Sequence, residues 1–160
     1  MEDAQRPDDP SLDYGILHDL IGHLLRLAYN RATLSFAQEV GRDLTPLQFM
    51  ILELLSRNPG IRHSRLAEGL DCSASVLTTA LKGLIASGRV EAMPGTDQRH
   101  RTYRITGAGA ADFDTLRHRI DASEARLTNG LSEADRARLR AILRAIAKPA
   151  GSAENSRTGD

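Results

Sequence analysis

Positively charged side chains gather in one short stretch past the middle of the chain. Residues 98–104 contain Arg99, His100, Arg101 and Arg104 and no acidic residue. The whole chain carries 21 basic and 21 acidic residues, so this stretch is a local excess in a neutral molecule. Clustered guanidinium groups attract polyanions, and arginine is suited to a narrow DNA minor groove. The chemistry predicted here is the binding of a nucleic acid.

Small polar side chains form a second candidate surface just before this stretch. Ser73 is a good N-cap for a helix running to about Ser87. At helical spacing, one side of that helix is apolar and is expected to face the core: Val76, Leu77, Ala80, Leu81, Leu84 and Ile85. The outward side then carries Ser75, Thr78, Thr79 and Lys82. Hydroxyl groups there, together with that of Ser73, can reach phosphates or base edges, which suits a helix lying in a major groove.

The elements around this helix complete a recognisable motif. A short helix over roughly residues 62–69 precedes it, and Asp71 and Cys72 form the turn between the two. After the helix, alternation predicts a strand beginning at Val90, turn residues at 94–97, and a return strand over 101–105. Tyr103 and Ile105 would occupy one face of the return strand, and Thr102 and Arg104 the other. The pattern predicts a winged helix-turn-helix.

Two alternatives to DNA recognition stay open at this point. The polar helix face is also what a plain solvent-exposed helix shows, and a charged hairpin tip also keeps a protein in solution. However, the helix pair and the arginine-rich hairpin occur together, and this combination favours DNA binding more strongly than either feature would alone.

The rest of the chain is predicted to be helical support. Apolar stripes indicate one long helix from Tyr14 to about Val40, and Thr45 and Pro46 predict the start of a second helix. Thr106 is expected to cap a helix through Leu127, and a last helix follows Ser132. The fold class is therefore mainly α with a small β-hairpin wing.

The organisation along the chain follows from these elements. Residues 1–13 are an acidic leader, and residues 149–160 are a tail; both are expected to be flexible. Between them, residues 14–148 form a single domain, with a reading lobe over about 45–106 and dimerisation helices over about 14–41 and 107–148. Helical stripes at both ends can pack against a second copy, which predicts a homodimer on a palindromic site. The alternative is that both ends fold back on their own core.

Several of these residues carry a family resemblance, and the wing residues are the most specific of them: Leu44–Phe49, Leu66, Ala67, Leu84, Gly88, Asp97, Arg99, Arg104–Thr106 and Gly109. Over roughly residues 14–147 the chain resembles the MarR family, the multiple antibiotic resistance regulators. The resemblance implies a homodimeric, ligand-responsive transcriptional regulator. It also implies that Arg99 enters the minor groove while Asp97 holds the wing arginines.

The chain departs from the family pattern where basic residues are common. Thr79 and Gly83 occupy two such positions in the recognition helix, and Ala92 occupies a third on the first wing strand. Fewer phosphate contacts predict weaker DNA binding that depends more on Arg99, Arg101 and Lys82.

The resemblance further implies an effector pocket, often for phenolic or lipophilic anions, to which His18, Arg26 and Tyr29 could contribute. Cys72, the only cysteine, precedes a helix N-cap, so a regulator that senses oxidation there is an alternative. A winged helix that binds a protein instead of DNA is another. Histidine spacing gives no metal site, and no cofactor is expected.

Neither catalysis nor a membrane is indicated by the sequence. It contains no phosphate-binding loop, nucleophile elbow or paired carboxylates, so an enzyme is not expected. Without a signal peptide or a long apolar run, the expected location is the cytoplasm.

Overall fold

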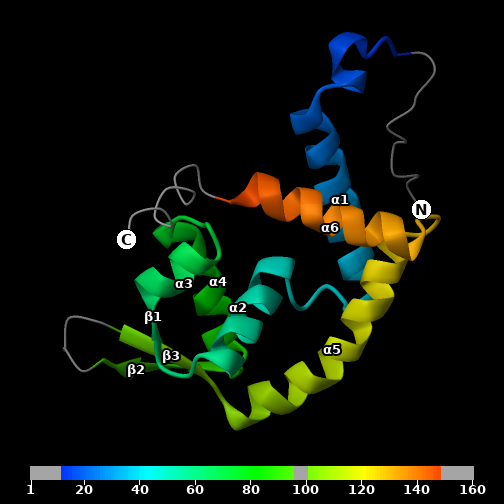
Figure 1. Cartoon of the computed structure of the whole chain (residues 1–160). Coiled ribbons are helices and arrows are strands. Elements are labelled where there is room, and N and C mark those ends of the chain that lie inside the picture. The colour runs from blue at the N-terminus through cyan, green and yellow to red at the C-terminus, as the bar shows by residue number, and fades with distance from the viewer. Residues whose placement is uncertain (1–11, 96–100, 149–160) are drawn as a thin grey trace, which may run out of the picture. The chain divides into compact units, whose positions relative to one another are not determined.

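The computed structural model describes residues 12–95 and 101–148 of the 160-residue chain. The chain forms two compact parts: the first ends at Leu127, and the second begins at Thr128. The first part holds most of the helices and the only sheet of the described residues (Figure 1). Mainly helical structure with a small antiparallel sheet confirms the predicted fold class.

The first long helix is shorter than the sequence predicted. A 3₁₀ turn, η1 (Gly15–His18), precedes α1 (Ile21–Glu39), and Leu20 between them is extended with φ −74° and ψ 108°. The carboxylate of Asp13 accepts a hydrogen bond from the Gly15 N–H at 2.9 Å, which stabilises a local turn in place of helix. The prediction of one continuous helix from Tyr14 was therefore wrong at its N-terminal end.

The next helix, α2 (Pro46–Arg57), begins where the sequence predicted. Thr45 Oγ1 accepts from the Gln48 backbone N–H at 3.2 Å, and Gln48 Oε1 accepts from the Thr45 N–H at 2.9 Å. This capping box pairs two N–H groups that the helix itself leaves open. Gln48 Nε2 also donates to the Ala80 carbonyl at 3.4 Å, which holds the N-terminus of α2 beside α4 (Ala74–Ala86).

The helix-turn-helix consists of α3 (His63–Gly69) and α4 (Ala74–Ala86), joined by a tight turn. Asp71 takes a left-handed conformation there, with φ 47°. Ser73 caps α4 as predicted, because its Oγ accepts from the Val76 N–H at 3.3 Å. Two residues predicted to face the core do not: Val76 is 49% exposed and Ile85 is 40% exposed. They lie at the edges of the apolar stripe, which the described elements cover only in part.

The sheet has one strand more than the predicted hairpin. Strands β2 (Val90–Pro94) and β3 (Arg101–Ile105) pair antiparallel, and the two-residue β1 (Ile61–Arg62) pairs with the other edge of β3. The resulting order is β1-β3-β2. Tyr103 is buried and Arg104 exposed, which confirms the predicted faces of the return strand.

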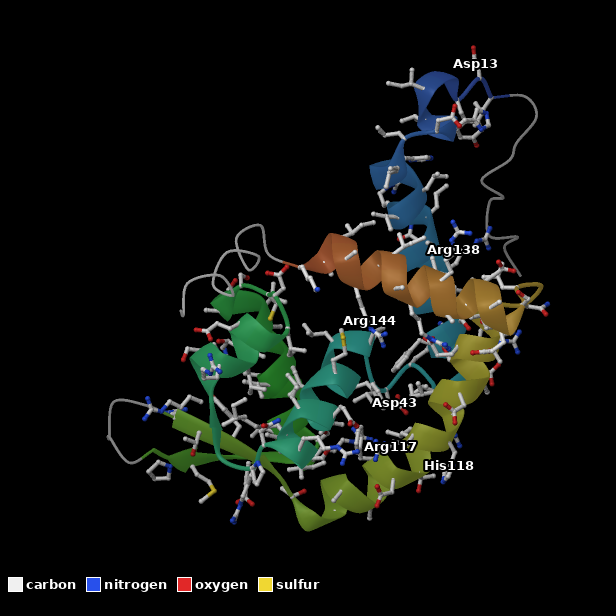
Figure 2. The ribbon with its side chains drawn as sticks, viewed as in Figure 1. Asp13, Asp43, Arg117, His118, Arg138 and Arg144 are labelled. Atoms are coloured by element: carbon white, nitrogen blue, oxygen red, sulfur yellow. The ribbon has the colours of Figure 1, made fainter. Side chains whose placement is uncertain are left out.

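The helix α5 (Gly107–Leu127) folds back along α1 of its own chain. Phe113 is buried in the core with its ring 5.2 Å from that of Phe49, and Ser35 of α1 donates to the Ser123 backbone oxygen at 2.8 Å. Figure 2 shows Arg117 directed toward α2, where it meets the Glu53 carboxylate at 3.4 Å. Fold-back onto the core thus accounts for one face of α5.

The second part of the chain contains α6 (Glu133–Ala147). Ser132 caps it as predicted, accepting from the Asp135 N–H at 3.1 Å. No residue of α6 is buried, although the helix is amphipathic. Large apolar side chains left exposed in this part are Leu131, Leu139, Ile142, Leu143 and Ile146.

Candidate nucleic-acid interface

The outward face of α4 carries the predicted residues Ser75, Thr78, Thr79 and Lys82, all exposed. The two threonine hydroxyls, however, turn back into the helix. Thr78 Oγ1 donates to the Ala74 carbonyl at 2.7 Å, and Thr79 Oγ1 donates to the Ser75 carbonyl at 3.0 Å. Each hydroxyl has a single proton, so both present lone pairs and methyl groups outward.

His63, at the start of α3, fixes one side of this face. Its Nε2 lies 3.1 Å from Thr78 Oγ1, and because that hydroxyl already donates to Ala74, the histidine nitrogen must be the donor. The imidazole also lies against the Tyr103 ring of β3, with centroids 6.1 Å apart. His63 therefore joins the recognition helix to the wing, a role that its sequence position did not signal.

A shallow groove of about 410 Å³ runs along the other side of α4, between that helix and the start of α2. Its walls combine small polar and apolar side chains: Thr45, Leu47, Gln48, Ser75, Val76, Thr79 and Ala80. Gly83 borders Gln48, since a Cβ on Gly83 would lie 2.7 Å from Gln48 Nε2. A basic side chain at position 83 would displace that amide, which gives this departure from the family pattern a structural reason.

Within the described part of the wing, one arginine is ion-paired and another is not. Arg104 is ion-paired with Glu91 of β2 at 2.8 Å, whereas Arg101 makes no ion pair with any described residue. Pairing neutralises part of the predicted basic cluster. Asp97, Arg99 and His100, the predicted wing tip, lie outside the described residues.

Two further cations accompany Arg101. Lys82 of α4 and Arg62 of β1 are exposed and form no ion pair with the residues described. Pairing of Arg62 with Thr102 brings this arginine to the wing. Arg62 could not be predicted from the sequence, because a strand of two residues shows no alternation that would reveal it.

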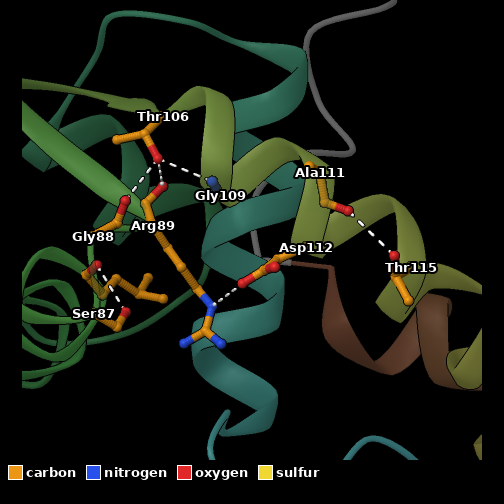
Figure 3. A network of polar contacts seen from close by, with 9 residues as sticks. Ser87, Gly88, Arg89, Thr106, Gly109, Ala111, Asp112 and Thr115 are labelled. Atoms are coloured by element: carbon orange, nitrogen blue, oxygen red, sulfur yellow. Dashed lines mark hydrogen bonds and ion pairs between the residues drawn. The ribbon is translucent and has the colours of Figure 1, made fainter.

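The wing is tied to α5 by Thr106 (Figure 3). Its hydroxyl lies 2.7 Å from the Gly88 carbonyl and 3.3 Å from that of Arg89, and it accepts from the Gly109 N–H at 3.0 Å. The predicted cap is confirmed. Arg89 adds an ion pair to Asp112 of α5, with 3.3 Å between Nε and Oδ2. These contacts join the wing to the first turns of α5.

A second cavity, of about 240 Å³, lies among α1, α2 and α5. Most of its walls are apolar: Ala32, Phe36, Pro46, Phe49, Met50, Ile120 and Leu127. The polar lining residues are Tyr29, Thr33, Ser123 and Glu124. Of the predicted pocket residues only Tyr29 lines it. His18 stacks on Tyr14 at 5.4 Å between ring centroids, and Arg26 is exposed on α1.

The remaining sequence hypotheses concern Cys72, metals and membranes. Cys72 is part buried against the core at the turn before α4. Within the described ranges, no three His, Cys, Asp or Glu residues gather as a metal site would require. A search of the same residues finds no helix with the length and apolar character to cross a bilayer.

Comparisons with known proteins agree with this geometry. Residues 44–100 match the model of the MarR family. The transcriptional repressor CouR, solved on a 23-mer DNA duplex, is 29% identical with a TM-score of 0.79, over 86% of this chain and 99% of its own. CouR bound to p-coumaroyl-CoA gives 27% identity and a TM-score of 0.77, over 88% of this chain and 100% of its own.

A more distant solved structure shares the fold. PcaV, a transcriptional regulator from Streptomyces coelicolor in complex with its natural ligand, is 21% identical with a TM-score of 0.79, over 85% of this chain and 97% of its own. Among curated protein sequences, none matches.

Proposed function

We propose that the protein is a transcriptional regulator that reads duplex DNA as a homodimer, because residues 44–100 match the model of the MarR family. It acts without catalysis, as a repressor on a palindromic operator, and a small molecule releases it. The observation that carries this proposal is the exposed face of α4 with its small side chains. Three exposed cations accompany it, Lys82, Arg62 and Arg101, and none of them forms an ion pair with a described residue.

The charges and bulk of this surface suit a major groove. Gly83 and Ala86 add almost no side chain to the exposed side of α4, so its backbone can approach base edges closely. Lys82 and the wing cations can then meet phosphates on either side, which supplies the electrostatic part of affinity. CouR, the relative solved on a DNA duplex, supports the same use of this fold.

A second copy of this chain is the proposed occupant of the uncovered apolar faces. In the first part, large apolar side chains are exposed on η1 and along α1: Ile16, Leu17, Leu20, Ile21, Leu24 and Leu25. In the second part, the exposed apolar side chains of α6 are Leu139, Ile142, Leu143 and Ile146. Exposed apolar surface on this scale is typical of an interface. A two-fold dimer would present two α4 helices to half-sites one DNA turn apart.

The cavity among α1, α2 and α5 is the proposed effector site. Flat walls such as Phe36 and Phe49 suit an aromatic body, and Tyr29 and Thr33 offer hydroxyl groups. The predicted effector, a phenolic or lipophilic anion, would place its phenolic end there. The lining itself includes the Glu124 carboxylate and no Lys, Arg or His, so a negative group would have to lie outside these walls.

Footprinting at low salt on the DNA flanking the gene tests the DNA-reading proposal. The wild-type protein should protect a palindromic site. Arg99→Ala should weaken binding and lower the salt slope by about one, as expected for one lost phosphate or groove contact. Arg119→Ala on α5 is the matched control and should change neither quantity.

Two results would contradict this function. Absence of any protected site at low salt would remove the regulator, and indifference of the binding to Arg99→Ala would favour an adaptor that docks on a protein. Adding p-coumaroyl-CoA or a phenolic carboxylate to the same footprint tests the effector, with Tyr29→Phe as the variant that should respond less.

A further inference from the structure

Val76 is an apolar residue placed where only polar ones were expected. It lies in the first turn of α4, is 49% exposed, and faces the open groove between Ser75 and Thr79. Isolated apolar side chains on a surface are common, but this one stands on the proposed reading helix next to the exposed Ser75. Its two methyl groups are therefore available to whatever enters the groove.

The neighbouring hydroxyls narrow what that partner can be. Thr78 and Thr79 donate their hydroxyl protons to the Ala74 and Ser75 carbonyls, so these two residues offer lone pairs and methyl groups rather than donors to a partner. A surface of this kind complements amino groups and methyl groups. It is mismatched to a pair of acceptors.

The edges of base pairs in the major groove differ in this respect. An A·T pair shows the adenine N6 amino donor beside the thymine C5 methyl, whereas guanine shows two acceptors, N7 and O6. Building on the proposed DNA-reading function, we propose that Val76 selects an A·T pair in each half-site by packing on the thymine methyl. Thr79 Oγ1 accepts from adenine N6 of the same or the adjacent pair.

The local charge favours DNA over a protein at this spot. Lys82 lies two turns further along α4 and forms no ion pair with the residues described, and the same exposed side carries the small residues Gly83 and Ala86. The Lys82 ammonium complements a phosphate of the DNA backbone, and the two methyl groups of Val76 complement a base edge.

Deoxyuridine scanning tests this proposal. A duplex is first selected from a random library with the full-length wild-type protein, and each thymine is then replaced singly by deoxyuridine, which removes only the C5 methyl. Loss of one buried methyl should weaken binding about fourfold at one position in each half-site. Val76→Ala should bind the unmodified duplex with a similar loss and should no longer respond to deoxyuridine there.

Ile85→Ala is the matched control, since Ile85 is also apolar and exposed but lies at the far end of α4. It should keep the full response to deoxyuridine. Thermal unfolding of both variants checks that each folds.

A selected site without an A·T pair in each half, or a Val76→Ala protein that still senses the methyl, overturns the proposal while DNA binding itself stands. Unchanged affinity of Val76→Ala also overturns it and leaves this side chain to a protein partner. Failure of the wild-type protein to select any duplex contradicts the proposed function itself.

Discussion

A Cβ atom on Gly109 would lie 2.2 Å from the backbone oxygen of Arg89. The first turn of α5 therefore packs directly on the chain segment that enters the wing. Thr106 closes the same joint by bonding to the Gly88 and Arg89 carbonyls and to the Gly109 N–H. The wing is thus held to α5 by close backbone contact, to which the Arg89–Asp112 ion pair adds.

Gly109→Ala should destabilise the protein. The new methyl group overlaps a carbonyl that is itself held in a network, so we expect a loss of about 1–3 kcal/mol in the free energy of unfolding. Chemical denaturation measures it. Gly107→Ala is the control, because a Cβ there meets nothing within 4 Å, and its stability should stay within about 0.5 kcal/mol of wild type. Equal effects of the two substitutions would contradict the close contact.

Thr106→Val tests the hydroxyl in this joint. Valine keeps the shape of threonine but cannot cap Gly109 or bond to the Gly88 carbonyl, so about 1–2 kcal/mol of stability should be lost. Thr106→Ser keeps the hydroxyl and should lose clearly less. A Thr106→Val protein as stable as Thr106→Ser would contradict a stabilising role for the hydroxyl network.

Leu24→Glu and Ile142→Glu address the proposed dimer. Each places a carboxylate on an apolar side chain that is about half exposed, one on α1 and one on α6. In a monomer such changes cost little, but buried between two copies an unpaired charge is strongly unfavourable. Light scattering should therefore show dissociation at concentrations where the wild type is a dimer. His118→Glu, on the exposed side of α5, should leave the mass unchanged.

Lys82→Gln should weaken DNA binding at every sequence to a similar degree. A phosphate contact is independent of the bases, so the slope of log affinity against log salt should fall by about one while the preferred site stays the same. Fluorescence anisotropy over a salt series gives both quantities. A changed site preference with an unchanged slope would instead assign Lys82 to a base edge.

Much of this fold was readable from the sequence because its signals are local. Thr45, Ser73 and Ser132 cap helices within three residues of themselves, and the buried run Leu77, Leu81 and Leu84 repeats at helical spacing. The wing strands could likewise be predicted from alternation around a turn. None of these signals needs knowledge of a distant segment.

Tertiary structure decided what depends on neighbours far apart in the chain. Exposure of Val76 follows from how far α2 covers α4, and the tiny strand β1 exists only because β3 offers it an edge. The bond from His63 to Thr78 and the pairing of Arg104 with Glu91 join residues 15 and 13 positions apart. Periodicity can say which way a side chain points on its own helix or strand, but not what lies opposite it. For that reason the partners of Thr78 and Arg104 could not be predicted from the sequence.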